Sequence, residues 1–153
     1  MIVSFFSQSE FMRRLAGNSH FLLGDLMNRA NRLRNAGMIK SGGRGRSACN
    51  IEPSEAALII LAAMSGVSAN ECPDVLKKLP DGLMDALTTI IDKAEPIEWL
   101  AVDYINNCGM VKKKSGETDI FGKTGKFKSR ALVELSGDVL RLLSVAMQGG
   151  NSA

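Results

Sequence analysis

Residues 56–64 form the longest apolar run in the chain, A-A-L-I-I-L-A-A-M, shortly after Pro53. Proline suits the first turn of a helix and Gly66 marks an end, so we expect a helix from Pro53 to Ser65. Because this helix is apolar all round, it must be buried in the middle of the protein or at a subunit interface, and we favour the core. The run has nine residues where a bilayer span needs ~20, so we expect no membrane segment.

The composition is that of a chain that folds. Of its 153 residues, 45% are hydrophobic and 23% are charged, which argues against wholesale disorder. The three cysteines are scattered and there is a single histidine, so we expect no disulfide framework, no metal site and no cofactor. The opening residues Met1 to Phe6 lack the basic leader and cleavage site of a signal peptide, which predicts a cytoplasmic protein.

The patterning predicts a mainly α fold with small β-hairpins, of the α+β class. Capping signals and apolar stripes predict helices over residues 8–16, 20–36, 68–76, 83–94 and 136–149, the second being either one helix or two that meet near Gly24. Residues 97–105 predict a strand, with a helix as the alternative, and residues 131–135 predict its partner strand. We expect residues 110–130 to be an exposed or partly mobile hairpin connection between these two strands. Residues 1–52 are expected to form one module and residues 53–153 a helical and β-hairpin support and dimerisation region.

The net charge of +3 hides an asymmetry along the chain. Residues 1–50 hold eight basic and two acidic residues, residues 51–110 three basic and ten acidic, and residues 111–153 eight basic and four acidic. Two basic ends therefore flank an acidic middle. Such an imbalance is typical of a protein that meets a polyanion, although a solvated basic surface gives the same pattern.

One face of the helix predicted over residues 20–36 is rich in Arg and Asn. It lies opposite the apolar stripe and carries Asn28, Arg29, Asn31, Arg32 and Asn35. Arginine pairs with guanine and asparagine with adenine, and both bind phosphate oxygens. A purely structural surface more often carries Glu and Lys pairs, so we favour a DNA-facing helix over a solvated one.

A basic, glycine-rich stretch follows, Lys40-Ser-Gly-Gly-Arg-Gly-Arg46, and residues 47–51 are expected to return as a strand. Glycine allows the positive φ of a tight turn, so this stretch predicts a hairpin with arginines at its tip. Together with Asn28-Arg-Ala-Asn-Arg-Leu-Arg-Asn-Ala-Gly-Met-Ile39, the stretch resembles the winged helix-turn-helix family over residues 8 to about 55. The resemblance implies a recognition helix in a major groove and a basic wing against the flanking backbone. The expected DNA-binding residues are Arg13, Arg14, Asn28, Arg29, Asn31, Arg32, Asn35, Lys40, Arg44 and Arg46.

We find no catalytic constellation in the sequence and expect no enzyme. The string Gly116-Glu-Thr-Asp-Ile-Phe-Gly-Lys-Thr124 resembles a phosphate-binding loop but has five residues between its glycines instead of four. The first hypothesis is a sequence-specific or architectural double-stranded DNA-binding protein, a transcriptional regulator acting as a homodimer.

The alternative hypothesis is a protein-binding inhibitor or adaptor that acts on a nucleic-acid-binding partner. Either its basic face occupies a nucleic-acid groove on that partner, or its acidic middle mimics a polyanion. The basic stretch followed by Pro53-Ser-Glu-Ala56 also resembles small phage and prophage proteins, which would make either activity a phage accessory role, such as an anti-defence one. RNA is a third candidate ligand, less favoured because no strand interleaves aromatic and basic residues.

Overall fold

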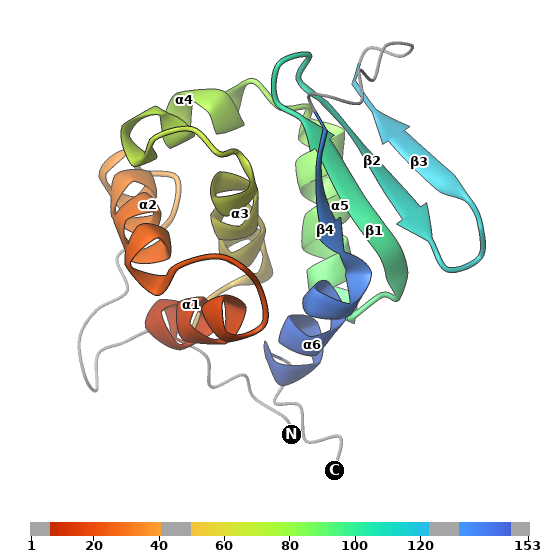
Figure 1. The fold of residues 1–153 in the computed structure, drawn as a ribbon, viewed down its shortest axis with the longest axis horizontal. Coiled ribbons are helices and arrows are strands. Elements are labelled where there is room, and N and C mark those ends of the chain that lie inside the picture. Colours follow the sequence, from red (N-terminus) through yellow and green to blue (C-terminus); the bar gives the residue numbers. More distant parts are fainter. Residues whose placement is uncertain (1–6, 41–49, 123–131, 148–153) are drawn as a thin grey trace.

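Helix α3, Pro53–Met64, lies in the middle of the helical part of the molecule, between α2, Leu23–Asn35, and α5, Asp81–Lys93 (Figure 1). The computed structural model describes residues 7–40, 50–122 and 132–147. Nearly every side chain of α3 is buried, and Ile60, Leu61 and Ala62 have no exposed surface. The helix expected from the apolar run is confirmed, and its all-round hydrophobicity is explained by neighbours on every side.

The helices that surround α3 begin with α1, Gln8–Gly17. The hydroxyl of Ser7 accepts a hydrogen bond from the Glu10 amide at 3.1 Å, as the capping signal predicted. Residues 20–36 hold one helix, α2, because Gly24 falls within its first turn, where it faces solvent and interrupts nothing. A 3-10 turn, Ala69–Glu71, leads into the short α4, Cys72–Lys77, before α5.

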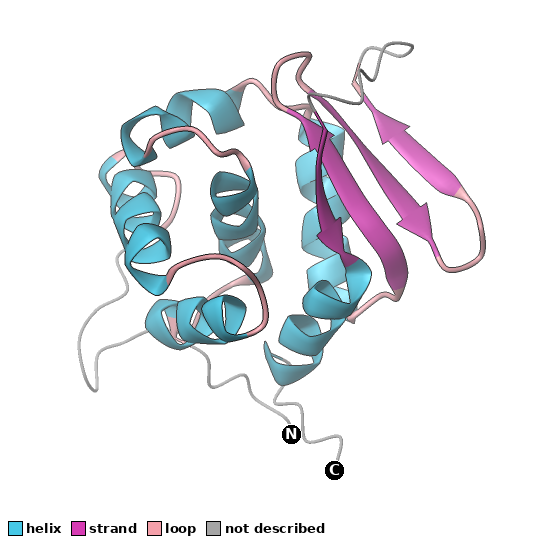
Figure 2. Ribbon diagram, viewed as in Figure 1, coloured by secondary structure: helices cyan, strands magenta, loops and turns pink. Residues whose placement is uncertain are grey.

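A four-stranded antiparallel sheet stands on the other side of α5 (Figure 2). Its strands are β1, Ile97–Asp103, β2, Cys108–Lys113, β3, Thr118–Phe121, and β4, Leu132–Ser136, in the order β3-β2-β1-β4. The predicted strand after Pro96 and its predicted pairing with the segment before Ser136 are confirmed, with Leu100 opposite Leu135. Helix α6, Gly137–Met147, follows β4 without a loop, as its capping signal indicated.

The connection expected over residues 110–130 is wrong over residues 110–121, because β2 and β3 pair with each other there, and residues 123–130 lie outside the described residues. Buried and partly exposed side chains alternate in the middle of β2: Val111 is buried, while Met110 and Lys112 are partly exposed. Lys113 pairs with Asp119 across the hairpin at 3.2 Å. The phosphate-loop look-alike therefore starts in a hairpin turn, which is not the strand-to-helix setting that such a loop needs.

The core is one cluster of buried apolar side chains that draws on nearly all of these elements. Phe11, Leu26 and Leu33 from the first two helices lie in the same cluster as Leu61 of α3 and Leu100 of β1. Residues on both sides of the expected boundary after residue 52 therefore share a core. Among the described residues, no helix is long and apolar enough to cross a membrane.

Candidate nucleic-acid interface

Four of the predicted DNA-binding residues lie together on the outer face of α2. Asn28, Asn31, Arg32 and Asn35 are spaced i, i+3, i+4 and i+7, and all four are exposed. Side chains at this spacing project from one side of a helix. In the part of the chain that the structure describes, no ion pair involves Arg32, so its guanidinium charge is not neutralised by a neighbouring carboxylate.

Arg29 does not belong to this face, and its expected contact with DNA is corrected. Its side chain is only 9% exposed, because position 29 is turned towards α3 and α4. The guanidinium donates hydrogen bonds to Asp25 at 2.7 Å, to the carbonyl of Ala62 at 3.0 Å and to the sulfur of Cys72 at 2.9 Å.

The position of Arg29 follows from the burial of α3. The last carbonyls of a helix have no partners within it, and a buried helix end cannot use water. The last turn of α3 contains no basic residue, and Arg29 brings a cation there from α2. Tyr104 donates its hydroxyl to the neighbouring carbonyl, that of Leu61. Burial alone would lower the pKa of Arg29, but its contacts with Asp25 and Cys72 outweigh this effect and raise it.

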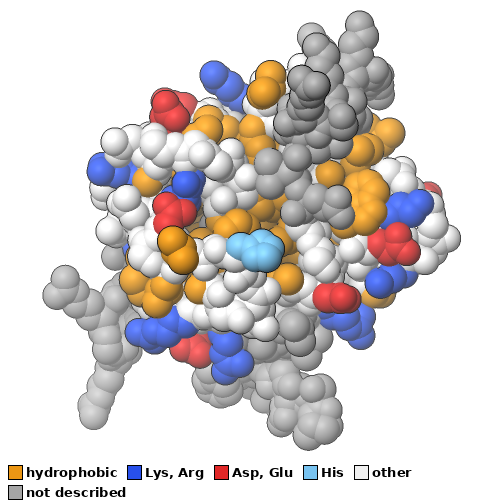
Figure 3. Space-filling model, in the orientation of Figure 1, with side chains coloured by type: hydrophobic (Ala, Val, Ile, Leu, Met, Phe, Trp, Pro, Cys, Tyr) orange, Lys and Arg blue, Asp and Glu red, His pale blue; other side chains and the backbone are white. Residues whose placement is uncertain are grey.

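Arg13 and Arg14 lie on the exposed side of α1, which packs against α2. Both pair with Glu10, Arg14 at 3.1 Å and Arg13 at 3.6 Å. In the space-filling view, basic side chains flank a carboxylate at the lower left, over α1 (Figure 3). These exposed pairs are weak, because solvent screens them, so a phosphate could compete with Glu10 for either arginine.

Lys40 is the last described residue of the segment that follows α2, and Arg44 and Arg46 lie outside the described residues. The wing expected over residues 40–51 is likewise mostly outside them; within them, Asn50 forms an isolated antiparallel bridge with Ser7, just before α1. The ammonium of Lys40 is 3.3 Å from a carboxylate oxygen of Glu52. This pair is exposed like those of Glu10, so a phosphate could compete with Glu52 for Lys40 as well.

A buried polar network connects these elements and was not predicted from the sequence. Gln8 is 3% exposed and Glu55 is 4% exposed. Gln8 donates to the carbonyl of Lys40 at 2.8 Å and accepts from Arg34 at 3.1 Å, while Glu55 accepts from the amide of Lys40 at 2.9 Å. A sequence signal existed: Glu52-Pro-Ser-Glu55 has the spacing of a capping box, and Glu55 indeed accepts from the Glu52 amide at 2.9 Å.

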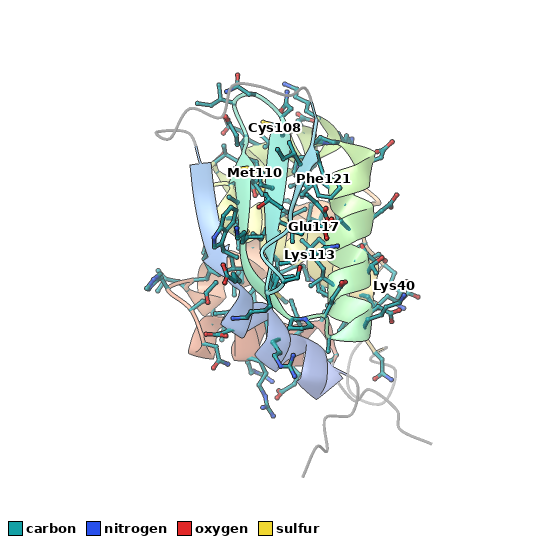
Figure 4. All side chains as sticks on the ribbon, turned by 90° about the vertical axis from the view of Figure 1, so that its right-hand side faces the viewer. Lys40, Cys108, Met110, Lys113, Glu117 and Phe121 are labelled. Atoms are coloured by element: carbon teal, nitrogen blue, oxygen red, sulfur yellow. The ribbon has the colours of Figure 1, made fainter. Side chains whose placement is uncertain are left out.

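A separate cleft of about 260 Å³ opens between α5 and the β2–β3 hairpin. It is lined by Asp85, Glu95, Asp119 and Lys113 over an apolar floor that includes Ile90. Lys113 and Glu117 lie at one end of the hairpin, while Cys108 and Phe121 lie at the other (Figure 4). With three carboxylates against one lysine, the cleft repels phosphate and is not part of a nucleic-acid interface.

Comparison of the chain with protein-family models, curated proteins and solved structures found no match. Within the described residues, no group of His, Cys, Asp and Glu side chains is arranged to hold a metal ion. A DNA-binding role therefore has to be argued from the geometry of the helices α1 and α2.

Proposed function

We propose that this chain binds double-stranded DNA, without catalysis, through the outer face of α2. The observation that carries the proposal is the row of Asn28, Asn31, Arg32 and Asn35, which is exposed and contains amide and guanidinium groups but no carboxylate. These groups bind both base edges and phosphates. We further propose that the chain is a transcriptional regulator of phage type that binds DNA in this way.

The dimensions of the row suit a major groove. Seven residues separate Asn28 from Asn35, which corresponds to about 10 Å along a helix, or roughly three base-pair steps. A groove about 12 Å wide admits a helix with its side chains pointing inward. Arg13 and Arg14, on the helix packed against α2, would then contact phosphates and fix the orientation.

The proposal is tested by fluorescence anisotropy with a random-sequence duplex at several salt concentrations. We expect submicromolar binding at low salt that weakens steeply as salt rises, because bound phosphates release counterions. Arg32→Met should lower the slope of log Kd against log salt by about one, the contribution of one phosphate contact. The matched control is Lys93→Met, which removes an exposed charge from the far end of α5 and should leave the slope unchanged. Absence of binding at low salt would overturn the proposal.

A second candidate function, an inhibitor or adaptor that binds a nucleic-acid-binding protein, is favoured by the acidic cleft beside α5. Its carboxylates Asp85, Glu95 and Asp119 would meet the basic groove of such a partner. In that case charge reversal at Asp85 would abolish capture of the partner, whereas Arg32→Met would not. Duplex binding that depends on Arg32 would decide against this candidate.

A further inference from the structure

The carboxylate of Glu55 connects the chain on both sides of the basic segment 41–49. One oxygen accepts from the amide of Lys40 at 2.9 Å, and the other accepts from the amide of Glu52 at 2.9 Å. The Lys40 ammonium also lies 3.9 Å from this carboxylate. Because Glu55 belongs to the buried helix α3, it ties both of these points to the core.

The network continues from Glu55 to the proposed DNA-binding face. The side-chain amide of Gln8 lies 3.4 Å from Glu55 and donates to the carbonyl of Lys40. Its oxygen accepts from Arg34, whose guanidinium also donates to Asn31 at 3.1 Å. An unbroken path of hydrogen bonds therefore runs from α3 through α1 to an exposed residue of α2.

We propose that Glu55 is a positioning residue of the DNA-binding surface, and that Gln8 transmits its effect to α2. This inference rests on the proposed function. Glu55 is buried and negatively charged, so it makes no contact with phosphate itself. Its effect is to hold α1, α2 and Lys40 in one fixed arrangement before DNA arrives, which spares the complex the entropic cost of ordering them.

The substitution Glu55→Gln separates this role from simple electrostatics. A glutamine has one acceptor oxygen, so it leaves either the Lys40 amide or the Glu52 amide facing an NH₂ group. Electrostatics alone predicts equal or tighter DNA binding, because a negative charge is removed near a polyanion site. Positioning predicts the opposite, a loss of roughly three- to tenfold in affinity, as expected when one or two side chains must be ordered on binding.

The matched control is Glu10→Gln, which removes the same charge from the exposed partner of Arg13 and Arg14. We expect this variant to bind duplex DNA as tightly as the wild type or more tightly. The positioning role is overturned if Glu55→Gln also binds as tightly as the wild type or more tightly. If Glu55→Gln does not fold, Gln8→Met takes its place, because it breaks the same path without removing a charge.

A second measurement does not depend on DNA. Native-state hydrogen exchange by NMR should show protected amides at Lys40 and Glu52 in the wild type and in Glu10→Gln, and loss of that protection in Glu55→Gln. Protected amides together with absent DNA binding would refute the proposed function while leaving the anchoring by Glu55 in place. Equal exchange in the wild type and in Glu55→Gln would refute the anchoring itself.

Discussion

Replacing Arg29 by methionine tests whether this residue serves the fold or the ligand. Methionine keeps most of the side-chain length and packing but removes every hydrogen bond that the guanidinium donates. The variant leaves the carbonyl of Ala62 with two bonds from neutral donors of Ser65, the hydroxyl at 2.7 Å and the amide at 3.3 Å. It also leaves Asp25 without its partner at 2.7 Å.

The expected cost follows from these contacts. A hydrogen bond from a charged donor to a buried acceptor contributes about 1.5–3 kcal/mol. The pair with Asp25, whose side chain is 44% exposed, adds only about 0.5–1 kcal/mol because solvent screens it. We therefore expect Arg29→Met to lower the free energy of unfolding by about 2–4 kcal/mol. For a chain of this length that corresponds to a fall in Tm of roughly 4–16 °C.

Urea unfolding followed by the fluorescence of Trp99, the single tryptophan, measures this change. Arg32→Met is the control, since the same replacement on the exposed face of α2 should alter stability by no more than about 0.5 kcal/mol. DNA affinity should show the reverse order: Arg32→Met weakens binding, and folded Arg29→Met binds nearly as the wild type does. Equal stability of the two variants, or a larger binding defect in Arg29→Met, would refute the placement of Arg29.

Two further predictions concern the backbone and the alkaline limit of stability. A Cβ at Gly137 would collide with the carbonyl of Ile97, so Gly137→Ala should destabilise the fold by about 3 kcal/mol or more. Gly24 lies in open space within a helix, so Gly24→Ala should stabilise the fold by about 0.5–1 kcal/mol. Thermal unfolding of both variants checks the two signs, and a tolerated Gly137→Ala would contradict the close approach of the β4–α6 junction to Ile97. Burial raises the pKa of Tyr104, the only tyrosine, so the unfolded chain ionises first and stability should fall as pH rises above about 10. Absorbance at 295 nm should then show no tyrosinate in the folded protein at pH 10. Tyr104→Phe should remove the part of the stability loss above pH 10 that comes from this residue. A normal tyrosine titration in the folded protein would contradict the burial of the Tyr104 hydroxyl.

The elements with one dominant period were predictable from the sequence. The all-apolar run gave α3, the β-branched stretch after Pro96 gave β1, and the capping signal at Ser7 marked the start of α1. The β2–β3 hairpin escaped prediction because Met110 is apolar at an outward position and Lys113 is charged on the side of the buried Val111. Both residues blur the alternation that marks a strand. A pattern read along one segment does not show which neighbours will cover its faces.

The candidate surface was predictable only in part, for the same reason. Helical spacing correctly placed Asn28, Asn31, Arg32 and Asn35 on an exposed face. Arg29 follows the same polar pattern, yet its side chain binds the carbonyl of Ala62 at the end of a buried helix, 33 residues further along the chain. No pattern within α2 shows that contact. Gln8 and Glu55 were missed because a buried polar network is a property of three elements together.

Two of the side chains that bind the last carbonyls of α3 come from opposite directions along the chain, Arg29 from before the helix and Tyr104 from after β1. During synthesis, the carbonyl of Leu61 in the helix at the centre of the protein therefore lacks its side-chain partner until Tyr104 has left the ribosome. For the same reason, residues 1–52 are a poor candidate for transfer into another scaffold, because Arg29 would lose its acceptor, the carbonyl of Ala62. The exposed face of α2 is therefore held in place by contacts that reach as far along the chain as Tyr104.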